Sequence, residues 1–460
     1  MIKGKTKKET KFIHALVSVL FLVGAMIYVV VLNGGSPQVS LIIGCAVSAV
    51  VAVFLGYSWD DILEYITDGI SQSLEAILIL LLIGSLVGSW IASGTVPAMV
   101  YYGLSLLNAR YFLAASALIC GIVSFAIGAW GTVGTVGIAL MGIGTALNVP
   151  PALVAGSIIS GSYFGDSMSP LSDATNLTAA VVGTDVFSVV KKRIIPVMSA
   201  FAAALVVYLI IGQKYAASSG SQVADAVEPL RQNLGSTFNI SILAVIPMIV
   251  VVGCILLKIP AIPSMLIGVL SGVITAVFLQ HAQLGDLVAV CTDGYVSDTG
   301  IELMDTLLTA GGMSSMMNTI SIIIIAMAFG GIMQKTGQMR ALVNPIVSLI
   351  KHFSGMNVLT VISCVLMNIL LPDQYLGISV PGQMLEEEYD ERGYSRVALA
   401  SGLVGGAVSS PLIPWNTCGL YCLALLGISS MQYAKFAFFN LLTALFIIIY
   451  GLLCPKKASV

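Results

Sequence analysis

Two aspartates lie in a polar stretch that separates two apolar runs of this sequence. Residues 161–176 read Gly-Ser-Tyr-Phe-Gly-Asp-Ser-Met-Ser-Pro-Leu-Ser-Asp-Ala-Thr-Asn and contain Asp166 and Asp173. Carboxylate, hydroxyl and amide oxygens are the ligands that hard cations such as Na⁺ prefer. A carboxylate can hold either a cation or a proton. The stretch therefore predicts a site at which sodium and a proton compete.

The same stretch predicts an interrupted helix. Pro170 lacks a backbone donor and clashes with the preceding turn, while Gly161 and Gly165 loosen a helix. The neighbouring Ser, Thr, Asp and Asn side chains compete for backbone hydrogen bonds. We therefore expect that 161–176 does not form a regular helix. At membrane depth such a backbone must face protein or a water-filled cavity.

The composition places these residues in a membrane protein. Of the 460 residues, 58% are hydrophobic and only 9% are charged, with a mean hydropathy of +1.00, whereas about a quarter of the residues in soluble domains are charged. The chain has no Walker A motif, Ser-His-Asp pattern or zinc-ligand spacing. We therefore expect neither an enzyme nor a bound cofactor. No basic tract beyond the N-terminus suggests nucleic acid.

The sequence contains an internal repeat. Residues 42–55 align with 266–279, and both segments end in Ala-Val-Phe-Leu. Ser169-Pro170-Leu171 recurs as Ser410-Pro411-Leu412, so a second polar break is expected at 409–417. Paired interrupted segments at matching positions of two repeats are typical of a transporter binding site. The second break adds three candidate site residues, namely Ser410, Asn416 and Thr417.

Charge bias predicts how the chain crosses a membrane. Cytoplasmic loops are rich in Lys and Arg, so the N-terminus and Lys191–Arg193 are expected inside and the acidic segment 281–317 outside. In the first unit we expect spans at 12–32, 37–57, 76–93 and 194–212, an interfacial segment at 95–109, a hairpin at 111–148 and a broken span at 150–185.

An odd number of crossings in each unit inverts the second repeat. The expected fold is an all-α polytopic membrane protein with two inverted-topology repeats, about ten spans, two re-entrant hairpins and two broken helices at the midplane. Its expected parts are a basic cytoplasmic N-terminus (1–11), a first repeat (12–213), an extracytoplasmic linker (214–238), a second repeat (239–454) and a cytoplasmic tail (455–460).

Each hairpin is expected to carry a polar tip, at 128–135 and at 372–375. The tips add Trp130, Thr132, Thr135, Asp373 and Gln374 as residues that meet the breaks.

Each of these residues also has a structural interpretation. Asp166 or Asp173 could cap a helix at a membrane edge, and a solvated turn explains Asp373 equally well. Asn416 and Thr417 could form interhelical hydrogen bonds alone, and Trp130 could serve packing alone.

The motif at 161–176, Ala-Trp-Gly-Thr-Val-Gly-Thr at 129–135 and Ser-Pro-Leu-Ile-Pro-Trp-Asn-Thr-Cys-Gly at 410–419 resemble the NhaC-type sodium/proton antiporter family. The resemblance extends over essentially the whole chain. It implies inverted repeats, two re-entrant hairpins, an elevator-like movement of a transport domain against a scaffold, and allows a homodimer. It also implies binding roles for Asp166, Ser169, Asp173, Thr175, Asn176, Trp130 and Thr132, and for Asp373, Asn416 and Thr417 of the second repeat.

Together these observations predict a secondary active transporter of a bacterial-type cell membrane, with both termini cytoplasmic. It would exchange cytoplasmic Na⁺ for external H⁺. The alternative is a Na⁺/H⁺-coupled organic-acid exchanger of the malate/lactate type, which the N-termini of two half-helices would favour. Against that alternative, the sequence suggests no intramembrane Arg or Lys for a small carboxylate, with Arg110 and Lys191 at the expected edges.

Overall fold

The computed structural model describes residues 7–453 except 34, 72, 107–108, 171, 219–231, 258, 302–303, 306–307, 348–352 and 371–372. The described residues are mostly helical, and the β-structure recorded among them is one isolated bridge between Tyr295 and Ala310. The expected tail 455–460 lies outside the described residues, as does much of the expected linker 214–238.

The first half of the chain forms a run of helices with one π-helical extension and one π-helical segment. They are α1 (Phe12–Met26), η1 (Ile27–Leu32), α2 (Pro37–Phe54), α3 (Trp59–Ser71), α4 (Leu74–Ala92), α5 (Thr95–Leu106), α6 (Ala109–Thr132), η2 (Val133–Gly137), α7 (Ile138–Ala146), α8 (Pro151–Met168), α9 (Asp173–Val181) and α10 (Val186–Ser218).

The second half repeats this order. Its helices are η3 (Ile242–Val245), α12 (Ile246–Leu256), α13 (Ala261–Gln280), α14 (Leu284–Asp293), α16 (Met313–Lys335), α17 (Gln338–Val347), α18 (Phe353–Leu370), α19 (Gln374–Glu391), α20 (Arg396–Ala407), η4 (Ser410–Leu412), α21 (Thr417–Leu426), α22 (Ser430–Tyr433), η5 (Ala434–Phe436) and α23 (Phe438–Leu453).

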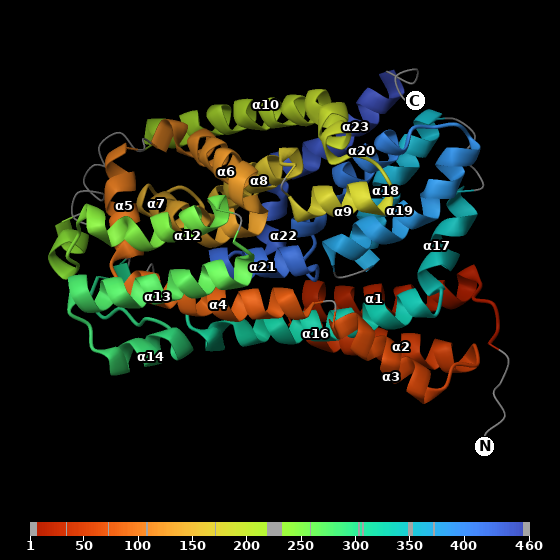
Figure 1. The fold of residues 1–460 in the computed structure, drawn as a ribbon, viewed down its shortest axis with the longest axis horizontal. Coiled ribbons are helices and arrows are strands. Elements are labelled where there is room, and N and C mark those ends of the chain that lie inside the picture. Colours follow the sequence, from red (N-terminus) through yellow and green to blue (C-terminus); the bar gives the residue numbers. More distant parts are fainter. Residues whose placement is uncertain are drawn as a thin grey trace.

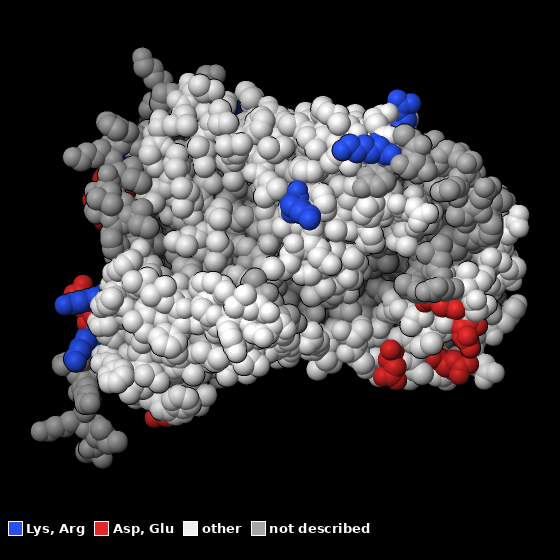
Figure 2. All heavy atoms as spheres, turned by 180° about the vertical axis from the view of Figure 1, so that it is seen from behind, with Lys and Arg blue, Asp and Glu red and all other residues white. Residues whose placement is uncertain are grey.

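Helix length and surface character confirm a polytopic membrane protein. Among the described residues, six helices are long and apolar enough to cross a membrane, and the number rises to nine if each of three bent pairs is one span. Large apolar side chains such as Phe54, Val206 and Phe278 are exposed. Figure 2 shows that the acidic side chains of one face gather at its two ends, and that the broad surface between them carries only scattered Lys or Arg side chains.

The helices lie in two layers with the second broken helix between them. Figure 1 shows α1, α4, α13 and α16 in one layer, with α2, α3 and α14 at its outer edge. The other layer contains α6, α8, α9 and α10 together with α18, α19, α20 and α23. The helices α21 and α22 lie in the middle of the molecule.

Corresponding helices of the two halves make equivalent contacts with the opposite half. Helix α4 packs on α13 and α14 of the second half, and its counterpart α16 packs on α2 and α3 of the first. Glycines permit the close crossings: a Cβ on Gly69 would lie 2.3 Å from the carbonyl oxygen of Met327, and one on Gly84 would lie 2.4 Å from that of Gly312. Gly69 of α3 meets the later part of α16 and Gly84 of α4 meets its start, so the segment formed by α3 and α4 runs antiparallel to α16. The inverted orientation of the repeats across a membrane stays a prediction.

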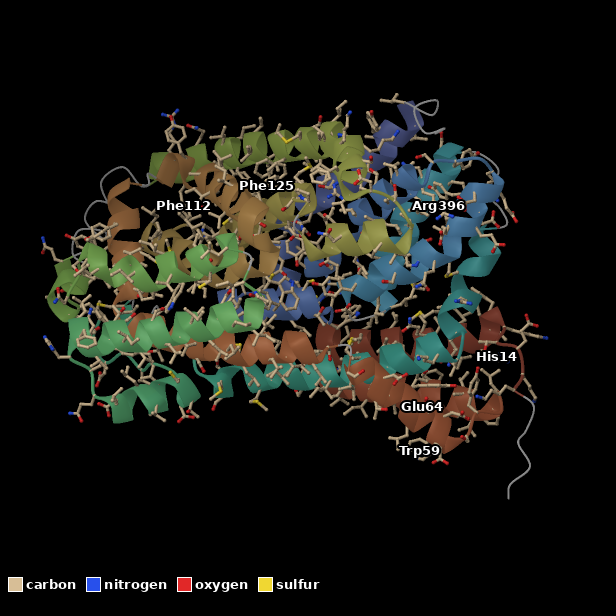
Figure 3. The ribbon with its side chains drawn as sticks, viewed as in Figure 1. His14, Trp59, Glu64, Phe112, Phe125 and Arg396 are labelled. Atoms are coloured by element: carbon tan, nitrogen blue, oxygen red, sulfur yellow. The ribbon has the colours of Figure 1, made fainter. Side chains whose placement is uncertain are left out.

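The first hairpin is formed by α6 and the segment that returns through η2 and α7. The chain reverses at Gly128, whose φ of 75° suits a residue without a Cβ. The two legs meet again at their base, where a Cβ on Gly144 would lie 3.0 Å from the Phe112 ring. Phe112 and Phe125 mark the first leg, which runs from the end of the molecule toward its middle (Figure 3).

The second hairpin, formed by α18 and α19, has the same architecture. Thr360 on α18 bonds to the Tyr389 hydroxyl on α19 at 2.9 Å. Helix α20 then packs along α18, as α8 packs along α6. Arg396 at the start of α20 lies at the end of the molecule opposite Phe112 (Figure 3). Its guanidinium pairs with Glu386 at 2.5 Å and with Asp390, and donates to the Val182 carbonyl after α9.

The expectation that 161–176 is irregular throughout was wrong for its first half. Helix α8 continues to Met168, and the break is confined to residues 169–172. Gly161 and Gly165 face α6, where a Cβ would lie 2.1 Å from the Ala117 carbonyl oxygen and 2.2 Å from that of Gly121. These glycines serve close helix packing, and the helix survives because α6 and the core surround it on several sides.

Two further boundaries differ from expectation. The first tip is Gly128 alone, because residues 129–146 resume a helical path in which Thr132 and Thr135 bond to the carbonyls of Gly128 and Gly131. Helix α10 begins at Val186 instead of residue 194, so Lys191–Arg193 are helical. Lys191 is exposed, but the same helical turn points Arg193 inward, where it is fully buried.

Candidate functional site

Asp166 lies where α8 passes the tip of the first hairpin. It is half-buried, and its Oδ1 accepts a 3.3 Å hydrogen bond from the backbone N–H of Ala129. A Cβ on Gly128 would lie 3.4 Å from the same oxygen. The left-handed turn at Gly128 therefore aims a backbone donor at this carboxylate. A backbone N–H stabilises a charged carboxylate without supplying a competing charge.

Three neutral side chains surround the first break and, with Asp166, form the first cluster (Asp166, Ser169, Thr175 and Asn176). Ser169 Oγ donates to the Phe125 carbonyl at 2.6 Å, which fixes the break to the hairpin leg. Asn176 Nδ2 donates to the carbonyls of Pro170 and Ser172, at 2.9 and 2.8 Å. The Pro170 carbonyl lies in the break, whereas the Ser172 carbonyl also accepts the backbone N–H of Asn176 at 2.9 Å as α9 begins. Asp173 begins α9, and its side chain lies outside the described residues.

The second break is held by Asp373, Gln374, Asn416 and Thr417, the second cluster. Asp373 caps α19: its Oδ1 accepts the backbone N–H groups of Tyr375 and Leu376 at 2.8 and 3.2 Å. Its Oδ2 accepts the Thr417 hydroxyl at 3.2 Å. Gln374 Oε1 lies 3.1 Å from the thiol of Cys418. The tip of the second hairpin therefore touches its own broken helix, as the first tip touches Asp166.

Asn416 makes the interhelical hydrogen bond that its structural interpretation predicted, and it also caps α21. Its Oδ1 accepts the Cys418 N–H at 3.1 Å and its Nδ2 donates to the Asn368 carbonyl at 3.1 Å. The amide oxygen thereby caps α21, and the amide nitrogen joins it to α18. Ser410 is fully buried at the start of η4.

The two halves meet through Trp130 and Tyr421. Their rings stack with centroids 4.3 Å apart, and the Tyr421 hydroxyl donates to the Trp130 carbonyl at 2.6 Å. Helix α21 thus packs against the first hairpin, and α9 packs against α19 of the second. Each broken helix therefore contacts its own hairpin at the break and the other half's hairpin along its second part. Thr132 and Thr135, by contrast, bond within their own helix.

Sequence reasoning missed one charged residue beside the first cluster. Arg193 is 0% exposed, and its Nη2 donates to the Thr175 hydroxyl at 2.8 Å. The expectation that no intramembrane cation is available was therefore wrong. It rested on Arg193 belonging to a basic cytoplasmic loop, whereas one turn of α10 carries an exposed and a buried basic residue. The spacing of the apolar residues after Val186 was the available signal.

The chemistry of the two clusters suits a monovalent hard cation better than a transition metal. The described residues contain no group of three His, Cys, Asp or Glu side chains able to hold a metal ion. They supply instead one carboxylate in each cluster with hydroxyl, amide and carbonyl oxygens nearby. Such oxygens suit a weakly held ion that must be released.

Two layers of apolar helices, two hairpins and two interrupted helices define the class of this protein, a multi-pass membrane transporter. The Na⁺/H⁺ antiporter family matches residues 161–454, more than half of the chain. The chain belongs to this family, of the NhaC type. The matching family is one of antiporters, which are transporters, and it indicates no catalytic reaction.

Curated relatives extend the match to nearly the whole chain. A malate-2H⁺/Na⁺-lactate antiporter of Bacillus subtilis is 35% identical, over 90% of this chain and 88% of its own. The Na⁺/H⁺ antiporter NhaC of Alkalihalophilus pseudofirmus is 33% identical, over 94% and 95%. The NhaC of Bacillus subtilis is 30% identical, over 97% and 99%.

Proposed function

We propose that this protein extrudes Na⁺ in exchange for H⁺ at a site that includes the Asp166 carboxylate. The observation that carries the proposal is the position of Asp166, half-buried between the tip of one hairpin and a broken helix. An acid at membrane depth is costly and functional by default. Asp173, Ser169, Thr175 and Asn176 belong to the proposed site by their place at the same break. Asp373, Asn416 and Thr417 are the contribution of the second half.

Competition between Na⁺ and H⁺ for the Asp166 carboxylate couples the transport of one ion to that of the other. A proton neutralises Asp166, and a sodium ion neutralises it equally while taking further oxygens from the break. The ion-free carboxylate keeps an uncompensated charge, which is costly to carry through an apolar environment. Movement between the two sides is therefore favoured only when a proton or a sodium ion is bound. Exchange follows because both cannot occupy the carboxylate together.

The contacts between halves suit a concerted movement. Because α9 packs on the second hairpin and α21 on the first, a displacement of either hairpin acts on both breaks. We place the protein in a bacterial-type cytoplasmic membrane with both termini in the cytoplasm. A homodimer is the assembly that the family resemblance allows.

Transport in everted vesicles or proteoliposomes tests the proposal. Sodium should dissipate an imposed pH gradient across vesicles that contain the wild-type protein. Asp166→Asn and Asp173→Asn should each reduce this flux about 100-fold or more, because the amide binds neither the proton nor the cation at comparable strength. Size-exclusion chromatography verifies that each variant folds.

Asp286→Asn is the matched control, since Asp286 is exposed on α14. It should leave the sodium-dependent flux unchanged. Retention of the wild-type flux by a folded Asp166→Asn protein would remove Asp166 from the site. Organic-acid exchange stays the alternative function, and lactate or malate added to the same vesicles tests it: a gradient that responds to these acids and not to sodium contradicts the proposal.

A further inference from the structure

Arg193 is a charged side chain that the proposed cation exchange does not use. It lies on α10, 0% exposed, with its Nη2 bonded to Thr175 directly after the first break. Arginine is almost never fully buried without a partner of opposite charge. Among the described residues, the hydrogen bond recorded for Arg193 goes to a neutral hydroxyl, and the Asp166 carboxylate acts on it electrostatically. The Arg193 guanidinium therefore has fewer hydrogen-bond acceptors around it than its N–H groups could use.

The remaining donors of the guanidinium have no hydrogen-bond partner. Neither Nε nor Nη1 of Arg193 is bonded, and both atoms are buried. A buried donor without a partner costs about 1–3 kcal/mol, and more when it is charged. Such a cost persists in a folded protein when a ligand meets the group during function. The fork of N–H groups on a guanidinium matches the two oxygens of a carboxylate.

We propose that Arg193 binds the carboxylate of a small organic acid beside the first break. A lysine would offer one point charge, whereas Arg193 keeps its Nε and Nη1 donors unbonded on the two edges of the guanidinium. Nη2 carries two N–H groups and gives one to Thr175, so its second N–H can complete a two-point contact with a planar anion along one of these edges. The Thr175 contact holds the guanidinium in position through its other nitrogen. Because Arg193 is 0% exposed, small acids are the appropriate probes, and lactate and malate serve as such.

The neighbouring Asp166 couples this site to the cation. Asp166 lies close enough to Arg193 to interact with it electrostatically. An ionised Asp166 therefore repels an incoming carboxylate, and a sodium ion on Asp166 removes the repulsion. Sodium and the organic acid should consequently bind with positive cooperativity, and by linkage each raises the affinity of the other by the same factor.

Binding and uptake of L-lactate and L-malate by the full-length protein in liposomes test the proposal. At least one acid should bind, more tightly with sodium than with choline as the replacing cation. Arg193→Gln should weaken this binding about tenfold or more, and it should lower sodium-driven proton flux without organic acid by a clearly smaller factor. Arg193→Lys should restore part of the binding, since it keeps the charge and loses the fork.

Arg340→Gln is the matched control, because Arg340 is exposed on α17, and it should bind the acids as wild type does. Three results overturn the proposal. One is a wild-type protein that exchanges sodium for protons yet binds neither acid. Another is full acid binding by Arg193→Gln or, if that variant does not fold, by Arg193→Lys. The last is an equal loss of sodium/proton exchange, which would make Arg193 a counter-charge for the aspartates. Failure of the sodium/proton proposal itself would appear separately, in the wild-type flux.

Discussion

Asp373 joins the tip of the second hairpin to the second broken helix. One carboxylate oxygen caps α19 through two backbone N–H groups, and the other accepts the Thr417 hydroxyl. The cap alone would be satisfied by asparagine, because its side-chain oxygen serves the same N–H groups. A role in holding sodium needs the negative charge. The two roles are therefore separable by substitution.

We expect Asp373→Asn to keep the stability of the wild type and to raise the half-saturating sodium concentration about tenfold, since a charged ligand contributes about 1.5–3 kcal/mol. Asp373→Ala should in addition lower the free energy of unfolding by about 1 kcal/mol, because the N–H groups of Tyr375 and Leu376 lose their acceptor. Thermal unfolding and sodium-dependent flux measure the two effects. Unchanged sodium dependence in Asp373→Asn would reduce Asp373 to a helix cap.

At the scale of the elements, glycine contacts fix how the first hairpin lies on α8. A Cβ at Gly161 or Gly165 would come within 2.2 Å of a backbone oxygen of α6. A backbone oxygen cannot turn aside as a flexible side chain can. The hairpin and α8 therefore pack as one unit, and this unit carries Asp166 together with the Gly128 turn.

Gly165→Ala should force α8 away from α6 and lower the free energy of unfolding by about 1–3 kcal/mol, the usual cost of overpacking. It should also weaken sodium-dependent flux, because the Ala129 N–H would shift from Asp166. Gly253→Ala is the control in α12, where a Cβ meets nothing within 4 Å. Thermal unfolding of the purified proteins compares the two. Equal melting temperatures would contradict the close packing of α6 and α8.

At the scale of the whole molecule, charge marks two opposite ends. The N-terminal segment joins α3 at one end through Lys7 and Asp61, whose nitrogen and oxygen are 3.1 Å apart. Lys335 at the end of α16 pairs with Asp68 of α3 at 2.9 Å. The loop that contains Val296 follows α14 at the other end (Figure 1). Hydrogen bonds from Ser58 and the contact with Lys7 lower the pKa of Asp61 to about 2.

This depressed pKa fixes the sign of one pH effect. The folded state holds the Asp61 proton less tightly than the unfolded chain does. The contacts of Asp61 therefore stabilise the folded state at pH values above the pKa of aspartate in the unfolded chain, which is about 3.9. It is lost as the pH falls toward about 2. At neutral pH the link between the N-terminal segment and α3 is therefore fully charged.

Labelling of single cysteines tests which end faces the cytoplasm. Val296→Cys should react with a membrane-impermeant maleimide in intact cells, and Glu387→Cys should react only in everted vesicles, because both side chains are exposed at opposite ends of the molecule. The parent protein for this experiment lacks its native cysteines. Labelling of both positions from one side would contradict the predicted topology.

The amino-acid sequence by itself determined the class of fold and the places where helices break. Apolar runs, the recurring Ser-Pro-Leu and the repeat of 42–55 at 266–279 predict a duplicated helical membrane protein with paired breaks. These signals are local or follow from alignment of the chain with itself. Pro170 and Pro411 lack the backbone donor that a helix uses, and both lie in the breaks. Proline alone does not decide the matter, because Pro196 and Pro381 lie inside α10 and α19. The predicted spans at 12–32 and 37–57 agree closely with α1, η1 and α2.

Only the tertiary structure decided which polar groups meet. Glycines in a polar stretch predict a break in a helix. Gly161 and Gly165 nevertheless lie in a continuous helix, because α6 packs against them within contact distance. Arg193 follows two lysines as a loop residue would, yet α10 turns it inward onto Thr175. Capping by Asp373 and Asn416 likewise depends on where distant helices end. Packing of segments far apart in the chain sets these contacts, and composition over a short window carries no information about it.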